Sequence, residues 1–176
     1  MDVNFFGLLD VTRKALEVMR DKNSPPGGLI RQVASIGGHK GTPTISIYCA
    51  SKWAVEGFTE SLSRELKPEW NIHVQLVEPG AFRTDATGRS MVFGEVENKA
   101  YDHLDARKTA AGRHGAEPGD TAKGATAMYE LATMNEPPLR CVIGRDAYKA
   151  MEMKLEMYAE NIKRFEELST STDVDE

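Results

Sequence analysis

Apolar positions along this chain switch repeatedly between helical spacing and the short runs that are typical of strands. Residues 2–21 place apolar side chains at steps of three and four, which predicts an amphipathic helix. Residues 46–66 repeat this spacing, and Pro68 ends the second helix. The short apolar runs at 29–34 and 71–78 end in turn-forming residues and predict strands. This order predicts an α/β fold in which helices cover both faces of a parallel sheet.

The second half of the chain has a weaker pattern. Residues 81–117 are of mixed polarity, and we expect a long excursion with one helix around 96–111. Such a long segment outside the core is typical of a functional or mobile region. Asp120 has the character of an N-cap, which predicts a further helix that reaches Leu131. The run 139–143 then predicts a third parallel strand.

A long helix follows the last predicted strand. Its apolar stripe consists of Ala147, Met151, Leu155, Tyr158, Ile162, Phe165 and Leu168. Residues 1–168 are therefore expected to form part of a single domain, which includes the excursion at 81–117. Residues 169–176 are polar and acidic, and we expect a disordered tail there.

Composition excludes several classes of partner. The formal net charge of −5 argues against a nucleic-acid or anionic-membrane surface, because both need clustered Lys and Arg. No apolar run approaches the roughly 20 residues that span a bilayer. The two cysteines are far apart, and the four histidines lack metal-ligand spacing. We therefore expect a cytoplasmic chain with no metal, no nucleic-acid partner and no membrane partner.

Tyr48 and Lys52 lie four residues apart on one face of the second predicted helix. An ammonium one turn away favours the phenolate form of a tyrosine, whose solution pKa is about 10. A tyrosine in such a position can exchange a proton with a substrate oxygen near neutral pH. A core tyrosine beside a lysine whose stem packs on apolar surface gives the same spacing. The pair alone leaves both interpretations open.

Other polar groups fall at the ends of the predicted strands. Ser35 follows the first strand, Pro79 and Gly80 follow the second, and Thr84 comes four residues after Gly80. Ligands of open α/β sheets bind at the carboxyl ends of the strands, where a hydroxyl can orient a substrate carbonyl. The alternatives are an ordinary cap for Ser35 and a plain β-turn for Pro79-Gly80. For Asn4, the alternative is a cap of the first helix.

These motifs together resemble the short-chain dehydrogenase/reductase family. The matching segments are DVNFFG at 2–7, VASIGG at 33–38, YCASK at 48–52 and EPGAFRT at 78–84. The resemblance covers nearly the whole chain and is clearest over 2–84. It implies a Rossmann-type, doubly wound parallel sheet, of which residues 1–168 would be the C-terminal part and 81–117 a substrate-binding excursion. It also implies hydride transfer between NAD or NADP and a small carbonyl or alcohol substrate.

The resemblance assigns four catalytic roles. Tyr48 matches the general acid/base, and Lys52 matches the lysine that binds the nicotinamide ribose and favours the phenolate. Ser35 matches the serine that orients the substrate. Asn4 matches the asparagine that anchors a water molecule in the proton relay.

The cofactor-binding residues implied by the resemblance are Tyr48, Lys52, Pro79, Gly80 and Thr84. The family's TGxxxGxG turn and NNAG segment have no counterpart in the sequence. The position that separates NAD from NADP has none either. We therefore expect a partial Rossmann sheet that lacks the N-terminal cofactor-binding strands, and the choice between NAD and NADP stays open.

Two interpretations of function follow. In the first, the chain is the catalytic part of an NAD(P)-dependent oxidoreductase that forms a homo-oligomer in its full-length form, through the helices at 2–21 and 46–67. In the second, it is a truncated, inactive relative, or a gene-model fragment, that acts at most as an interaction module. We expect this polypeptide alone to be inactive. A glycine-rich TGxxxGxG motif encoded in frame upstream of Met1 would favour the first interpretation.

Overall fold

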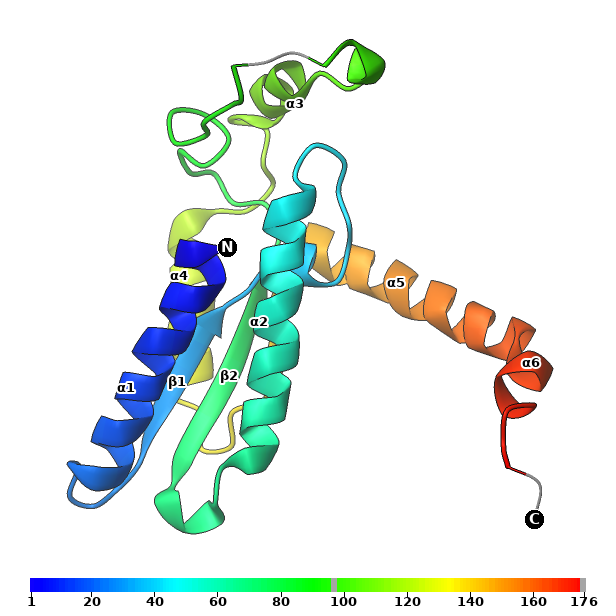
Figure 1. The fold of residues 1–176 in the computed structure, drawn as a ribbon. Coiled ribbons are helices and arrows are strands. Elements are labelled where there is room, and N and C mark those ends of the chain that lie inside the picture. Colours follow the sequence, from blue (N-terminus) through cyan, green and yellow to red (C-terminus); the bar gives the residue numbers. More distant parts are fainter. Residues whose placement is uncertain (96–97, 175–176) are drawn as a thin grey trace.

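The computed structural model describes residues 1–95 and 98–174 and contains a three-stranded parallel sheet with helices on both faces (Figure 1). The strands are β1 (Gly28–Val33), β2 (Ile72–Pro79) and β3 (Arg140–Ile143), in the order β1-β2-β3. In the register, Gly28 lies opposite Ile72, and Leu76 lies opposite Arg140. The prediction of three parallel strands is confirmed, and their carboxyl ends meet at one edge.

Six α-helices and four helical turns of 3-10 or π type are found in the described residues. The α-helices are α1 (Leu8–Asp21), α2 (Ser46–Glu65), α3 (Ala106–Arg113), α4 (Thr121–Ala132), α5 (Arg145–Arg164) and α6 (Glu166–Thr170). The helical turns are η1 (Asp2–Gly7), η2 (Ile36–Gly38), η3 (Pro68–Trp70) and η4 (Lys99–Tyr101). Helices α1 and α2 lie side by side over one face of the sheet, and α4 lies behind it (Figure 1).

Alternating side chains of β2 supply the two sides of the core. Ile72 and Val74 are buried in a cluster with Leu62 of α2. Val77 is buried in a separate cluster with Leu131 of α4. Since successive side chains of a strand point to opposite faces, the central strand holds both helical layers to the sheet.

The excursion contains a shorter and later helix than predicted. The expected helix at 96–111 is wrong in its extent, because α3 begins only at Ala106 and ends at Arg113. The Asp105 carboxylate accepts a hydrogen bond of 2.8 Å from the Lys108 amide and so caps the first turn of α3. Residues 96–97 of the expected helix lie outside the described residues.

Helix α5 extends away from the sheet (Figure 1). Its predicted apolar stripe is largely uncovered: Leu155 is 60% exposed and Ile162 is 73% exposed. Phe165 separates α5 from α6, which continues to Thr170. The first two residues of the expected disordered tail are therefore helical, which corrects that prediction. Within the described part of the chain, no helix has the length and apolar character needed to cross a membrane.

Candidate functional site

Ser35 stands just beyond β1, at the carboxyl edge of the sheet, and begins the turn η2. Its extended backbone makes it the N-cap of this turn, and its Oγ accepts a hydrogen bond of 3.1 Å from the Gly37 amide. Ser35 is therefore a turn cap, as the alternative interpretation predicted. Because Oγ acts as an acceptor in this bond, its own O–H remains available to a substrate oxygen.

Tyr48 lies in the first turn of α2, directly against the same turn. A Cβ atom built on Gly37 would lie 3.2 Å from Tyr48 Cε1 and 3.5 Å from Ser35 Oγ. The tyrosine ring and the serine hydroxyl thus border the space that a side chain at residue 37 would fill. The Tyr48 side chain is also 39% exposed, so a ligand at this edge can reach it.

Lys52 lies one turn further along α2. Its Nζ donates a hydrogen bond of 2.8 Å to the Val33 carbonyl at the end of β1 and lies 5.8 Å from the centre of the Tyr48 ring. Burial lowers the pKa of Lys52, and the negative charge of Glu56 opposes this effect. The two distances place the Lys52 ammonium close to both the Tyr48 ring and the carboxyl end of β1.

Asn4 reaches α2 from the π-type turn η1. Its Nδ2 donates a hydrogen bond of 3.2 Å to Ser51 Oγ, and the Ser51 hydroxyl donates one of 2.7 Å to the Tyr48 carbonyl. The N-cap of η1 is Met1 and that of α1 is Gly7, so the interpretation of Asn4 as a helix cap is wrong. π-type turns are frequent at functional sites.

The turn that follows β2 is held by the start of α5. The Ala81 amide donates a hydrogen bond of 2.8 Å to Asp146 Oδ2, and the Gly80 amide donates one of 2.8 Å to the Ile143 carbonyl. Asp146 lies so close that a Cβ atom on Gly80 would collide with it. Sequence reasoning missed this role of Asp146, which its place in the first turn of a helix did not indicate.

Thr84 borders a mainly apolar cavity of about 390 Å³ next to this turn. The cavity is lined by Pro79, Gly80, Ala81, Phe82, Thr84, Ala86, Thr87, Glu117, Thr121, Gly124, Ala125 and Met128. The structure thus places Pro79, Gly80 and Thr84 together at the end of β2. Ser35, Tyr48, Lys52 and Asn4 form a second group, joined through η2 and α2.

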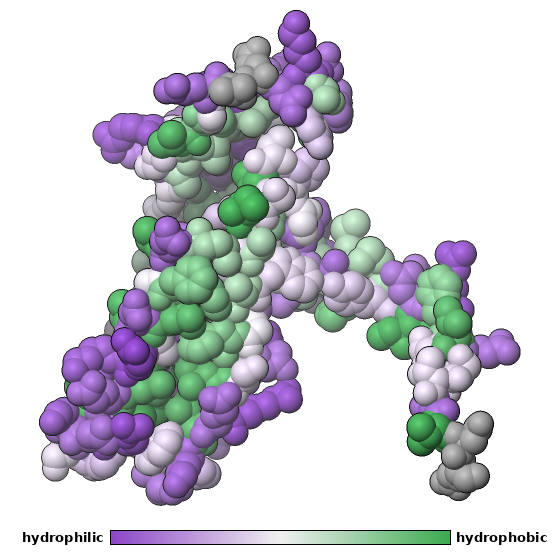
Figure 2. Space-filling view, viewed as in Figure 1, coloured by the Kyte–Doolittle hydropathy of each residue, from purple (hydrophilic) through white to green (hydrophobic). Residues whose placement is uncertain are grey.

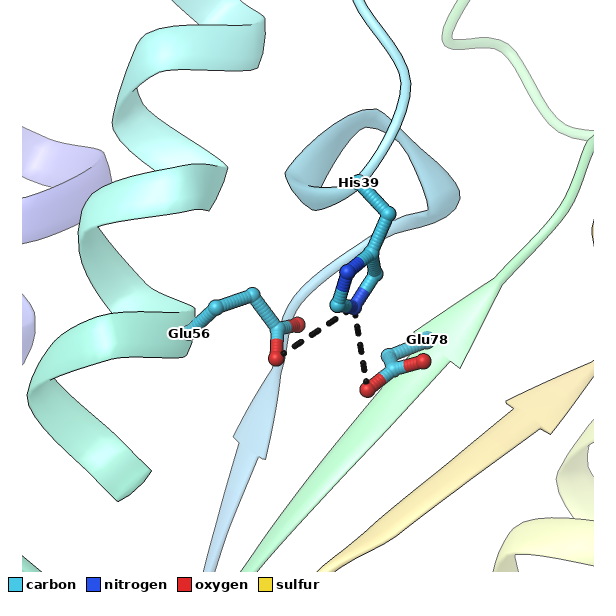
Figure 3. Close-up of side chains that lie close together, drawn as sticks. All are labelled: His39, Glu56 and Glu78. Carbon is cyan, nitrogen blue, oxygen red and sulfur yellow. Dashed lines mark ion pairs between the residues drawn. The ribbon is translucent and has the colours of Figure 1, made fainter. Parts of the chain in front are cut away.

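Three titratable side chains that the sequence did not single out meet beside this site (Figure 3). His39 Nε2 lies 3.3 Å from Glu78 Oε1 and 3.5 Å from Glu56 Oε2. Two features of the sequence could have indicated these residues. Glu56 lies four residues after Lys52, just as Lys52 lies four residues after Tyr48, and Glu78 comes directly before Pro79.

The carboxylates of Glu56 and Glu78 are nearly or fully buried. They raise the pKa of His39 to about 9, Glu56 contributing most. The three ligand atoms lie within 4.8 Å of one another, as a metal site requires. However, Arg140 Nε lies 3.2 Å from Glu56 Oε2. The imidazolium and the guanidinium, which Arg140 shares with Glu60, already face the two carboxylates, and this argues against a metal ion there.

A family model and a curated relative both match this chain over long stretches. The family model described as short chain dehydrogenase matches residues 1–91. An uncharacterised oxidoreductase of Schizosaccharomyces pombe is 34% identical over 176 residues, which cover all of this chain and 60% of the relative. The chain thus spans about 60% of the length of this curated relative.

Solved structures show the same fold. A short-chain dehydrogenase from Streptomyces avermitilis superposes with a TM-score of 0.80 at 32% identity, over 96% of this chain and 60% of that protein. A short-chain dehydrogenase/reductase from Burkholderia phymatum, solved in complex with NAD, gives a TM-score of 0.71 at 22% identity, over 99% of this chain and 60% of that protein.

Proposed function

Since this chain belongs to the short-chain dehydrogenase family, we propose that it carries the catalytic residues of an NAD(P)-dependent oxidoreductase acting on a carbonyl/alcohol pair. The observation that carries the proposal is the position of Tyr48. Its ring borders Ser35 at the carboxyl edge of the sheet and lies near the Lys52 ammonium. Ligands bind at this edge in open α/β sheets.

In the proposed reaction, Tyr48 Oη gives a proton to the carbonyl oxygen during reduction and takes it back during oxidation. The Ser35 O–H donates a hydrogen bond to the same oxygen and orients it toward Tyr48. The Lys52 ammonium stabilises the phenolate that forms when the proton leaves. A bound nicotinamide supplies or accepts the hydride, which is the chemistry that side chains cannot provide.

The proton on Tyr48 must be replaced after each reduction. We propose that Asn4 takes part in a relay to solvent through an anchored water molecule. Its contact with Ser51, whose hydroxyl bonds to the Tyr48 carbonyl, supports a place near this segment of α2. An Asn4→Ala variant would then have a lower rate of reduction with the tyrosine still present.

The residues present fit the nicotinamide end of the cofactor. Lys52 offers an ammonium for ribose hydroxyls, and the Pro79–Thr84 turn offers an exposed hydroxyl at Thr84. The sequence has no TGxxxGxG turn to bind the pyrophosphate. We therefore propose NAD or NADP as the cofactor, without a preference between them.

The proposal is tested by Tyr48→Phe in a chimera that places the glycine-rich strand-turn-helix segment of a relative before residue 1. We expect turnover of NADH or NADPH with a carbonyl substrate panel to fall by roughly 10²- to 10⁴-fold, because the proton donor is lost. Tyr129→Phe is the matched control, since Tyr129 is an exposed residue of α4. Equal turnover of Tyr48→Phe and the parent would refute the role of Tyr48.

A further inference from the structure

One short turn joins Ser35 to His39. Ser35 is the N-cap of η2 and His39 is its C-cap. The Gly37 amide bonds to Ser35 Oγ, and the Gly38 amide donates a hydrogen bond of 2.8 Å to the Ser35 carbonyl. The His39 amide closes the turn with a bond of 3.0 Å to the Ile36 carbonyl. A single hydrogen-bonded turn therefore connects the backbone of His39 to that of Ser35.

The turn also packs tightly on α2. A Cβ atom on Gly38 would lie 2.9 Å from Glu56 Cγ and 3.1 Å from the Lys52 carbonyl. Gly37 faces Tyr48 in the same way. The two glycines allow the backbone to lie against α2, but they provide no side chain that fastens it there.

His39 supplies that fastening. Its imidazole points between Glu56 of α2 and Glu78 of β2 (Figure 3). The Glu78 side chain is 0% exposed, and neither of its oxygens has a hydrogen-bond partner among residues 1–95 and 98–174. A buried carboxylate without hydrogen bonds needs a cation nearby.

The other charged groups around the cluster come from α2, β3 and α5. On α2, Glu60 pairs with Arg140 Nη2 at 2.6 Å, and Lys52 lies one turn before Glu56. Arg140 Nε of β3 lies 3.2 Å from Glu56 Oε2 and 3.7 Å from Glu78 Oε1. The Trp53 ring lies beside His39, and the ammonium of Lys154 of α5 lies 5.7 Å from its centre. Without His39, Arg140 would be the one cation in contact with both carboxylates in the described part of the chain.

We propose that His39 is a positioning residue, whose charged imidazole fastens the end of η2 to Glu56 and Glu78 and thereby holds Ser35 beside Tyr48. The inference rests on the proposed function only in the role of Ser35, which orients the substrate oxygen. The attachment of the turn through His39 is a property of the 176-residue chain and can be measured without any catalytic assay.

The test is amide hydrogen exchange, read by NMR, in the 176-residue chain. In His39→Leu, we expect the amides of Gly37 and Gly38 to exchange at least tenfold faster than in the parent, while amides in the middle of α2 keep their protection. The Gly37 amide reports on Ser35 directly, because it bonds to Ser35 Oγ. His73→Leu is the control, since His73 is an exposed histidine of β2.

His39→Lys separates the charge from the ring. It restores a cation between the two carboxylates, and we expect it to recover most of the lost protection of Gly37 and Gly38. Exchange at Gly37 and Gly38 within twofold of the parent in His39→Leu would overturn the inference. So would equal loss of protection in the Lys and Leu variants. Neither result depends on turnover, so a failure of the Tyr48→Phe test would leave this measurement intact.

Discussion

Tyr48, Lys52 and Glu56 follow one another at intervals of four on α2, so the Lys52 ammonium has a phenol one turn before it and a carboxylate one turn after it. The charge of Glu56 partly offsets the burial that lowers the pKa of Lys52. His39 and Arg140 in turn balance Glu56. The Tyr48-Lys52 pair was predictable because helical periodicity brings residues i and i+4 together. The contact with His39 was not, because it depends on how a loop folds back onto a helix.

The charge on His39 should make the stability of the fold depend on pH. The pKa of His39 is raised from 6.5 to about 9, so the folded state binds the imidazole proton more tightly than the unfolded state. The stabilisation is complete below about pH 6.5 and is lost as the pH rises through about 9. We expect a loss of up to about 3 kcal/mol in the free energy of unfolding.

Urea denaturation of the parent and His39→Gln between pH 6 and 10 measures this effect. The difference in unfolding free energy between the two proteins should shrink as the pH rises. A difference that stays constant over this range would show that the charge of His39 does not stabilise the fold.

At the scale of elements, periodicity predicted the strands and the two helices that carry the site to within one or two residues at most boundaries. Periodicity placed the start of α3 too early, because the Asp105 side chain caps this helix and so sets where it begins. It also identified the apolar stripe of α5 without indicating that the described residues leave much of it uncovered. A hydrophobic pattern shows which face of a helix avoids water, but not what covers it.

Two glycine substitutions should have opposite effects on stability, because Gly124 of α4 is closely packed and Gly112 of α3 is not. A Cβ atom on Gly124 would lie 2.6 Å from Phe82 Cε1, so Gly124→Ala should displace this ring and destabilise the fold by about 1–3 kcal/mol. A Cβ atom on Gly112 of α3 meets no heavy atom within 4 Å. Gly112→Ala should therefore stabilise α3 by up to about 1 kcal/mol.

Thermal denaturation followed by circular dichroism compares these two variants with the parent. Equal melting temperatures of Gly124→Ala and Gly112→Ala would contradict the packing that we describe.

The start of α5 also predicts a measurable link between elements. Asp146→Ala removes the acceptor of the Ala81 amide and should cost about 1 kcal/mol of stability. The larger effect should be a more mobile turn after β2, seen as faster amide exchange at Ala81. Asp173→Ala in the C-terminal tail is the control. Unchanged exchange at Ala81 in the Asp146 variant would show that α5 does not hold this turn.

At the scale of the whole molecule, both edges of the sheet and part of a helical surface are left uncovered in the described residues. Within residues 1–95 and 98–174, β1 and β3 each pair only with β2. Figure 2 shows apolar side chains gathered over the face formed by α1 and α2. Exposed apolar surface of this kind favours association, and the homo-oligomer expected for the full-length form stays a prediction. The sequence motifs located the candidate catalytic residues, whereas the contacts of His39 and Arg140 with Glu56, and of Asp146 with Ala81, arise only in the tertiary structure.

We propose that the 176-residue chain carries the nicotinamide side of a dehydrogenase site, and its sequence has no TGxxxGxG turn for the pyrophosphate. Calorimetric titration of NADH and NADPH into the purified 176-residue chain tests it most directly, with the glycine-rich chimera as the positive control. We predict micromolar binding of a dinucleotide by the chimera and none by the chain alone, because the helix N-terminus that binds the pyrophosphate is supplied only in the chimera. Micromolar binding of either dinucleotide by the 176-residue chain as a soluble monomer would contradict the account.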